Sequence, residues 1–403
     1  MGEVWLRYTS AATLPTLFAT TRNRYPMNER LTVTYQLTPL EGQNVEAMCR
    51  GIALEQTVEM EADLVGSPSI MEEIVGEIIE IIPLNEPVGS FRAMIGYCSS
   101  VTAFSIPQLL NLLFGNISIK NNIRIIGLHL PAELLTQWQG PTYGIAGVRD
   151  LIGVHHRPLA VTALKPMGAK PEKLAAMAKA FSLGRGDIVK DDHGLTDQPF
   201  CTFRERVERC QEAVTIAAQT SGHDTLYFPN LCAPHEELEA QLELAIGLGV
   251  RGVLVSPFLL GLDTVRYLSQ KYPLVFMAHP AFSGTHFHDR RHGMTPGVLL
   301  GTLFRLIGCD FSIYPNRGGR FSFSANECSG INQALWEELG TMPPAFPTPA
   351  GGMTLKRIPE MAQAYGVDTA YLIGSALLRE DPDLTVATQR FVAAIERCFS
   401  AAA

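Results

Sequence analysis

The sequence predicts an α/β protein in which a C-terminal (β/α)8 TIM barrel follows a smaller α+β N-terminal domain. Eight short apolar runs recur between residues 159 and 375, and segments with helical spacing of apolar residues separate them. The runs are continuous rather than alternating, which is typical of parallel strands buried on both faces. Eight β-then-α units in roughly 250 residues match the count and length of a TIM barrel. A doubly wound sheet with a similar alternation of strands and helices is the alternative, and the eight units favour the closed barrel.

The predicted elements follow in order along the chain. In the N-terminal part, residues 30–37 alternate like a strand, residues 42–56 read as a helix, and residues 69–84 pass from helix to strand. The predicted barrel strands are residues 159–166, 187–192, 225–230, 252–258, 274–280, 310–316, 345–353 and 369–375. Segments between them, such as 171–184 and 236–249, end in glycine, as helix C-termini commonly do. We place the domain boundary so that residues 1–135 form the first domain and residues 136–403 the barrel.

The composition excludes several classes of protein. Hydrophobic residues make up 46% of the chain and charged residues 18%, which argues against disorder. The formal net charge of −8 offers no basic stripe for nucleic acid or anionic lipid. The eight cysteines form no C-x-x-C pair, so neither a structural zinc site nor a disulfide framework is expected. With no leader pattern and no membrane-length apolar run, we expect a cytoplasmic protein without nucleic-acid or membrane partners.

Polar residues stand at the C-terminal ends of several predicted strands, where TIM barrels carry their chemistry. One such residue would more often be structural, whereas several on one rim predict a functional site. These residues are Lys165, Lys190, Asp192, His193, Asn230, His279, Asn316 and Arg317. The small residues Gly351, Gly352, Gly374 and Ser375 follow the last two strands. Backbone N–H groups in these two loops commonly bind phosphate, so we expect a phosphate site there.

Several motifs carry a resemblance to a known family. They are "GNISIK" (115–120), "QGPTYGI" (139–145), "TALKPMG" (162–168), "GDIVKDDHGLTDQPF" (186–200) and "AGGM" (350–353). In this order, and along almost the whole chain, they resemble the RuBisCO large subunit. "MAHPAFSG" (277–284) is more similar to the RuBisCO-like proteins (form IV), the branch that does not carboxylate.

The resemblance implies a metal site at the second barrel strand. Lys190 matches the lysine that CO2 converts to a carbamate, and Asp192 matches an acidic ligand of Mg²⁺. His193 stands where the family has glutamate, and Asp191 is expected to point elsewhere because side chains alternate along a strand. Nitrogen is a softer ligand than Mg²⁺ prefers. We therefore expect either tolerance of Mn²⁺ or another transition metal, or an acid–base role for His193.

The resemblance also implies three catalytic residues. Lys165 matches the lysine that moves protons at the enediolate, and His279 matches the histidine after the fifth strand. Asn116 matches an asparagine that the N-terminal domain lends to the site of a partner subunit, which implies a homodimer or a larger assembly. Glu55 is a weaker match to a catalytic glutamate of that domain, because the surrounding residues differ.

Departures from the family pattern limit which substrates and reactions are expected. Pro280, Ile313 and Ala350 stand where RuBisCO holds the distal phosphate of its substrate, and residues 316–323 contain no lysine to meet CO2. The resemblance therefore implies a ligand with one phosphate group and no carboxylation.

Three functions fit these expectations. The first is a lyase or C–C hydrolase of a phosphorylated 3-oxo sugar acid, as in the apionate-pathway decarboxylase or transcarboxylase/hydrolase of 3-oxo-isoapionate 4-phosphate. The second is a methionine-salvage enolase or isomerase of the 2,3-diketo-5-methylthiopentyl-1-phosphate type. Its base position is Met94 here, and nearby Arg92 is too basic to replace it. The third is a non-catalytic descendant with a binding or regulatory role.

Overall fold

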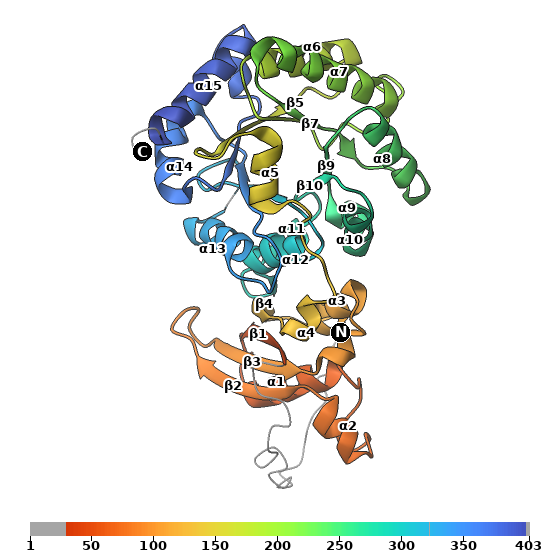
Figure 1. Ribbon diagram of the computed structural model, residues 1–403. Helices are drawn as coiled ribbons and strands as arrows, with labels where there is room; N and C mark the ends of the chain where they lie inside the picture. Colours follow the sequence, from red (N-terminus) through yellow and green to blue (C-terminus); the bar gives the residue numbers. More distant parts are fainter. Residues whose placement is uncertain (1–29, 322, 400–403) are drawn as a thin grey trace.

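The computed structural model describes residues 30–321 and 323–399. Residues 1–29, 322 and 400–403, which the predicted domain ranges include, lie outside the described residues. Figure 1 shows a small sheet with helices at one end of the molecule and a larger unit in which helices surround a ring of strands. In the described ranges, no helix is both long and apolar enough to cross a bilayer.

The N-terminal sheet has five strands in the order β11-β4-β1-β3-β2. Its elements are β1 (Leu31–Leu37), α1 (Val45–Glu55), α2 (Pro68–Glu73), β2 (Glu77–Pro83), β3 (Phe91–Tyr97), α3 (Ile106–Phe114), β4 (Ile123–His129) and α4 (Ala132–Leu135). Strand β11 (Gly293–Met294) comes from the barrel part and pairs with β4 in parallel. Every second residue of β1 is fully buried, and the Tyr35 hydroxyl donates to the Leu113 carbonyl of α3. The three N-terminal elements predicted from the sequence are confirmed.

All eight predicted barrel strands are present. They are β5 (Leu159–Leu164), β6 (Ile188–Asp191), β7 (Leu226–Phe228) continued by β8 (Asn230–Leu231), β9 (Gly252–Val255), β10 (Val275–Ala278), β12 (Phe311–Pro315), β13 (Phe346–Ala350) and β14 (Ala370–Leu372). They form two parallel sheets, β14-β5-β6-β7 and β13-β12-β10-β9-β8. Strands β13 and β14 also lie against each other, which closes the ring. The predicted (β/α)8 barrel is confirmed.

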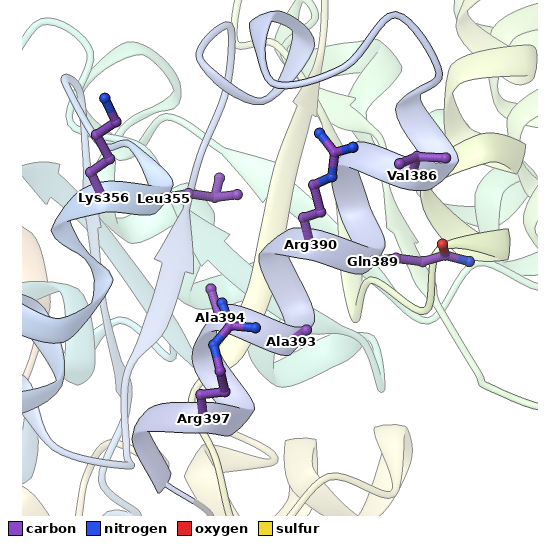
Figure 2. A pocket seen from close by; sticks show the side chains of 8 residues that line it. All are labelled: Leu355, Lys356, Val386, Gln389, Arg390, Ala393, Ala394 and Arg397. Atoms are coloured by element: carbon purple, nitrogen blue, oxygen red, sulfur yellow. The ribbon is translucent and has the colours of Figure 1, made fainter.

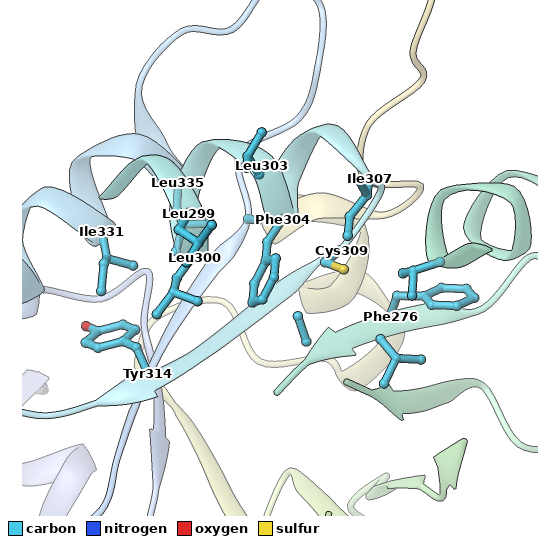
Figure 3. Close-up of a cluster of buried hydrophobic side chains, with 14 of the residues drawn as sticks. Phe276, Leu299, Leu300, Leu303, Phe304, Ile307, Cys309, Tyr314, Ile331 and Leu335 are labelled. Carbon is cyan, nitrogen blue, oxygen red and sulfur yellow. The ribbon is translucent and has the colours of Figure 1, made fainter. Parts of the chain in front are cut away.

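Helices surround these strands on the outside (Figure 1). They are α6 (Pro171–Leu183), α7 (Phe203–Ser221), α8 (Leu238–Gly247), α9 (Pro257–Leu260), α10 (Leu262–Lys271), α11 (Gly284–Phe287), the π-helix Gly297–Thr302 with α12 (Leu303–Leu306), α13 (Ala325–Trp336), α14 (Ile358–Tyr365) and α15 (Leu384–Phe399). Figure 3 shows how this layer packs: Leu300 and Phe304 lie between their helix and strand β12, whereas Leu303 lies on the opposite side of the helix. Burying each such side chain stabilises the fold by about 1.5–3 kcal/mol.

The barrel interior has its own apolar core. Phe311 of β12 stacks on Phe346 of β13 with ring centroids 4.9 Å apart, and Phe228 of β7 meets Phe311 edge-on. Helix α5 (Gly144–Ile152) covers this core with Val148, which is fully buried. The start of α5 is fixed to the segments before β12 and β13, because Gly144 N–H donates to Asp310 Oδ1 and Ile145 N–H to the Pro344 carbonyl. The N-terminal ends of the strands are thereby closed.

Candidate active site

Lys165 and Asp192 form an ion pair at the C-terminal ends of two neighbouring strands. Lys165 follows β5 and Asp192 follows β6, and the two strands pair in parallel, so their ends coincide. Lys165 Nζ contacts Asp192 Oδ2, while Asp192 N–H donates to the Leu164 carbonyl. The Lys165 side chain is 35% exposed and the Asp192 side chain 15%, so the pair is open to solvent on the lysine side.

Lys190 lies beneath this pair in a nearly sealed position. It is 3% exposed, and its ammonium group donates a hydrogen bond to the Asp191 carbonyl at 3.0 Å. Burial lowers the pKa of Lys190 to about 8, because the charged form loses its hydration; the charge of Asp192 opposes the shift and that of Lys165 adds to it. An appreciable share of this amine is therefore neutral near physiological pH, as a reaction with CO2 requires.

Asp191 points away from the cluster, as strand alternation predicts. Its carboxylate accepts hydrogen bonds from Arg206 Nε at 2.8 Å, the Tyr227 hydroxyl at 2.9 Å and Asn230 N–H at 3.0 Å. Arg206 is itself fully buried. The Asp191–Arg206 ion pair therefore fixes helix α7 to strand β6, and neither side chain is available to bind a ligand.

His193 and His279 stack on each other next to the ion pair. Their ring centroids are 4.2 Å apart and their planes 13° from parallel, and His193 Nδ1 is 3.3 Å from Asp192 Oδ1. Burial lowers the pKa of His193 and lowers that of His279 well below its usual range, and the charge of Lys190 adds to both shifts. His279 Nδ1 accepts a hydrogen bond from Ala281 N–H, so neutral His279 carries its proton on Nε2.

Asn230 positions the loop that carries His193. Its side-chain amide donates to the carbonyls of His193 and Leu195, both at 2.9 Å. Asn230 is fully buried, and its Oδ1 has no hydrogen-bond partner among the described residues. The sequence placed Asn230 at a strand end but did not assign this positioning role, since only the three-dimensional contact shows it.

One of the two glycine loops, the loop after β14, adjoins the cluster. Gly351 and Gly352 have φ values of +76° and +80°, and a Cβ on Gly352 would stand 2.7 Å from the Gly319 backbone. Only glycine fits this close approach of two loops. A Cβ on Gly374 would lie 3.8 Å from Lys165 Cε, so the loop after β14 adjoins the lysine. Ser375, the next residue, is exposed. The backbone of the loop after β14 therefore suits a phosphate group beside Lys165.

Two of the predicted strand-end residues hold loops together. Asn316 is fully buried, accepts a hydrogen bond from the Tyr365 hydroxyl at 2.6 Å and contacts Met353 Sδ. Arg317 pairs with Glu360 at 2.8 Å on the surface. Their contacts are structural. Arg320, three residues further, does act on the site electrostatically, because its charge lowers the pKa of His193 together with burial and the two lysines.

Asn116 lies in the N-terminal domain and is exposed. Its amide donates to Glu55 Oε1 at 3.2 Å and to Glu59 Oε1 at 2.9 Å. Partial burial raises the pKa of Glu55, but hydrogen bonds from Lys120 and Asn116 outweigh this and lower it. Among the described residues, Asn116 hydrogen-bonds within its own domain and not with the barrel cluster. Its place in a shared site stays a prediction.

Whether a divalent metal fits the cluster depends on which side chains there can act as metal ligands. No group of three or more His, Cys, Asp or Glu side chains within residues 30–321 and 323–399 could hold a metal ion. At the cluster, Asp192 and His193 are two suitable ligands, and unmodified Lys190 is a cation that repels a metal. A carbamate on Lys190 would supply the missing third ligand as oxygen. The residues therefore fit a metal only together with CO2 on Lys190.

A cavity of about 650 Å³ lies elsewhere, on the outer side of α15. Figure 2 shows Lys356, Arg390 and Arg397 around it, with Ala393 and Ala394 among the lining residues. The lining contains no carboxylate, imidazole or thiol, so it offers no metal ligands. The strand-end cluster is the better candidate for the chemistry.

Comparison with known proteins identifies the family of the chain. The model for the ribulose bisphosphate carboxylase large chain, catalytic domain, matches residues 144–378, and the model for its N-terminal domain matches residues 20–134. The 5-methylthioribulose-1-phosphate isomerase of Rhodospirillum rubrum is 35% identical over 92% of this chain and 97% of its own. The 2,3-diketo-5-methylthiopentyl-1-phosphate enolase of Geobacillus kaustophilus is 32% identical over 83% of this chain and 84% of its own.

A solved structure agrees. The RuBisCO-like protein of Rhodopseudomonas palustris is 35% identical, covers 91% of this chain and 97% of its own, and superposes with a TM-score of 0.82. Together with the two family models, this likeness spans both the N-terminal sheet and the barrel. The chain belongs to the ribulose bisphosphate carboxylase large-chain family and, within it, to the RuBisCO-like proteins.

Proposed function

We propose that this protein is an enolising isomerase of a phosphorylated methylthio ketose of the 5-methylthioribulose 1-phosphate type. One observation carries the proposal: Lys165 adjoins both the carboxylate of Asp192 and the glycine loop at Gly374. A ketose phosphate held with its phosphate at this loop would present the carbons near its ketone to the lysine. Proton transfer at those carbons is the chemistry that such an arrangement favours.

The chain's own residues supply the proton transfers. Lys165 removes a proton from a carbon next to the ketone, and the electron pair moves to the ketone oxygen to give an enediolate. The Nε2–H of neutral His279 is a hydrogen-bond donor available to an oxygen of that enediolate. The proton of the neighbouring hydroxyl passes to the former ketone oxygen, and Lys165 returns its own proton to the former carbonyl carbon, so that the carbonyl changes place and no atom is gained or lost.

Lys190, Asp192 and His193 would hold the divalent metal once CO2 has formed a carbamate on Lys190. When bound, the metal stabilises negative charge on the ketone and hydroxyl oxygens. Asp192 would then take part both in holding the metal and in the ion pair with Lys165.

The relatives favour isomerisation over the first function expected from the sequence. Those reported above are named as an isomerase and an enolase, which supports the methionine-salvage alternative more than a lyase of a 3-oxo sugar acid. Residue 94, the expected enolase base position, is Met94 on β3 and cannot take a proton. Lys165 on the barrel is therefore the base in our proposal.

The test is turnover followed by NMR in D2O. Protein incubated with bicarbonate and Mg²⁺ or Mn²⁺ should convert 5-methylthioribulose 1-phosphate to an isomeric ketose or aldose phosphate, with exchange of carbon-bound hydrogen for solvent deuterium. Absence of both product and exchange would overturn the proposal. Release of CO2 from 3-oxo-isoapionate 4-phosphate would establish the lyase instead, and turnover of the diketo phosphate would establish the enolase.

Assembly can be tested in the same assay. If Asn116 completes the site of a partner subunit, Asn116→Ala and Lys165→Met proteins are each inactive alone. Mixed and reassembled in equal amounts, they should regain about a quarter of the parent activity, because half of the dimers are mixed and each has one intact site. No recovery upon verified subunit exchange would place Asn116 outside the site.

A further inference from the structure

Large apolar side chains are exposed around the C-terminal rim of the barrel. Six of the exposed large apolar residues stand in segments that directly follow barrel strands. They are Met167, Phe200, Leu259, Phe282, Phe321 and Leu378. Exposed apolar groups that gather at one place mark a binding surface more often than they occur by chance. Three of them, Met167, Phe282 and Phe321, are tied to residues of the candidate site.

Met167 lies over the metal motif. It follows Lys165 by two residues, is 55% exposed, and packs its terminal methyl group against Gly194. A Cβ on residue 194 would stand 2.6 Å from that methyl group. Gly194 is the residue after His193, so the Met167 thioether borders the metal motif directly. Its flexible, polarizable side chain suits contact with another sulfur or alkyl group.

Phe282 projects from the turn that fixes His279. It is 71% exposed, and its φ of +66° lies in the left-handed region that a bulky residue rarely adopts. Two hydrogen bonds hold the turn: Ala281 N–H donates to His279 Nδ1, and the Ser283 hydroxyl donates to the Pro280 carbonyl at 2.7 Å. The backbone thus keeps a strained conformation that turns an aromatic ring into solvent three residues from His279. Such strain is commonly kept where it serves a site.

Phe321 lies beside the phosphate loop. It is 50% exposed, and a Cβ on Gly351 would meet the edge of its ring at 3.6 Å. The guanidinium of Arg320 lies over the same ring, 5.0 Å from its centroid. Phe321 therefore combines an open aromatic face with a position next to the backbone groups assigned to phosphate.

We propose that Met167, Phe282 and Phe321 form an apolar collar that binds the apolar end of the substrate, a methylthio or alkyl group. This rests on the proposed function. The names of both relatives describe substrates with phosphate on C1 and methylthio on C5, so that one molecule carries an anionic and an apolar end. The collar continues directly from the phosphate loop at Gly351 and the metal motif at Gly194, which is where the second end of such a molecule would emerge.

The collar predicts selectivity that binding can measure without turnover. The probes are 5-methylthiopentyl phosphate and 5-hydroxypentyl phosphate. Both have a phosphate group on a five-carbon chain, and they differ in whether the far end carries a methylthio or a hydroxyl group. Isothermal titration of the full chain, with bicarbonate and Mn²⁺ present, should show the methylthio ester binding about 10-fold tighter or more. In Phe282→Ala and in Met167→Gln, the ratio should fall to within about threefold, with affinity for the hydroxy ester unchanged.

Ile216→Ala is the matched control, because Ile216 is 44% exposed on α7 and outside the collar; its ratio should equal that of the parent. Equal binding of the two esters by the parent, or equal losses for both esters in the variants, would overturn the collar. A change of oligomeric state in Phe282→Ala, seen by light scattering, would also overturn it by making the surface a subunit contact. If selectivity is present but no ketose is turned over, the collar stands and the proposed reaction fails.

Discussion

The two ends of the barrel hold similar groups in opposite circumstances. At the N-terminal end, Asp187 before β6 binds Arg157 and His223; at the C-terminal end, Asp192 after β6 meets Lys165 and His193. Asp187 is fully buried and accepts four hydrogen bonds, two from Arg157 and one each from His223 and Ala160 N–H. These occupy about all four lone-pair sites of a carboxylate.

The Asp192 carboxylate, at the C-terminal or upper end of the barrel, has fewer hydrogen-bond partners than Asp187, at the N-terminal or lower end. Asp192 Oδ2 has Lys165 as its partner, and Oδ1 has Gly194 N–H at 3.2 Å and the ring of His193 at 3.3 Å. The Lys165 and His193 side chains are 35% and 43% exposed, against 11% and 9% for Arg157 and His223. A sealed and saturated cluster stabilises the fold, whereas an open and unsaturated one keeps groups available for a ligand. The difference lies in exposure and hydrogen-bond supply, not in residue type.

The largest expected effect is at the upper cluster. Lys165→Met should lower kcat by about 10³- to 10⁴-fold, because the proton-transfer group is lost. Its melting temperature should stay close to that of the parent, since a half-open ion pair contributes little to stability. Steady-state kinetics and calorimetry measure the two quantities.

His279→Gln serves as the companion variant, because it keeps an amide hydrogen-bond donor at a site where we assign a donor and no base. It should lose less activity than Lys165→Met. Equal losses in both variants, or a large fall in melting temperature for Lys165→Met, would contradict the division between a chemical end and a structural end.

The next effect concerns the lower cluster. Asp187→Asn should lower the free energy of unfolding by about 3–5 kcal/mol, because Arg157 is left buried without its counter-charge. The remaining folded protein should keep kcat within about threefold, since the change lies at the far end of the strand. Urea unfolding and active-site titration give the two values. A variant of normal stability but low activity would show that Asp187 belongs to the chemistry.

The sequence predicted which polar residues lie at the upper, C-terminal end, whose catalytic roles stay a prediction, and it predicted nothing about the lower, N-terminal end. Continuous apolar runs located all eight strands, and polar residues directly after them located Lys165, Asp192 and His279. Asp187 also borders a strand, but a charged residue before an apolar run is common and its partners Arg157 and His223 are distant in sequence. The apolar rim was equally hidden, because the exposure of Phe282 depends on a left-handed backbone that no local pattern indicates. Contacts between loops, unlike periodicity within an element, cannot be derived from spacing.

A smaller effect is the pH dependence of stability, which should differ between two buried carboxylates at the lower end, Asp310 and Asp187. Burial raises the pKa of Asp310 to about 6, although the N–H groups of Phe276, Gly144 and Tyr143 oppose the shift. Between the unfolded value of about 4 and this value, the folded state holds more protons than the unfolded state. Rising pH from 4 to 6 should therefore reduce the stability that Asp310 contributes, by about 1–3 kcal/mol.

Asp187 has the opposite sign. Burial raises its pKa, but His223, Arg157 and Ala160 N–H outweigh burial and lower it, so its contribution is present above about pH 4 and is lost on acidification below that value. Urea unfolding of the parent, Asp310→Asn and Asp187→Asn between pH 3 and 7 measures how the free energy of unfolding changes with pH, and the difference of each variant from the parent gives the contribution of each carboxylate. Parallel curves for both variants would show that the two carboxylates do not differ in this way.

The smallest effect concerns His193, which stands where the resemblance to RuBisCO implies a glutamate. His193→Glu replaces a nitrogen ligand by an oxygen ligand and adds a negative charge beside Lys190 and Asp192. Mg²⁺ prefers oxygen ligands and Mn²⁺ tolerates nitrogen, so the variant should gain affinity for Mg²⁺ by about 10-fold relative to Mn²⁺. Metal titration in the presence of bicarbonate, monitored by calorimetry, measures both constants. His193→Gln, which changes the ligand without adding charge, separates ligand type from charge. If neither variant changes either affinity, His193 does not bind the metal, and its stacking on His279 then assigns it to positioning or proton transfer.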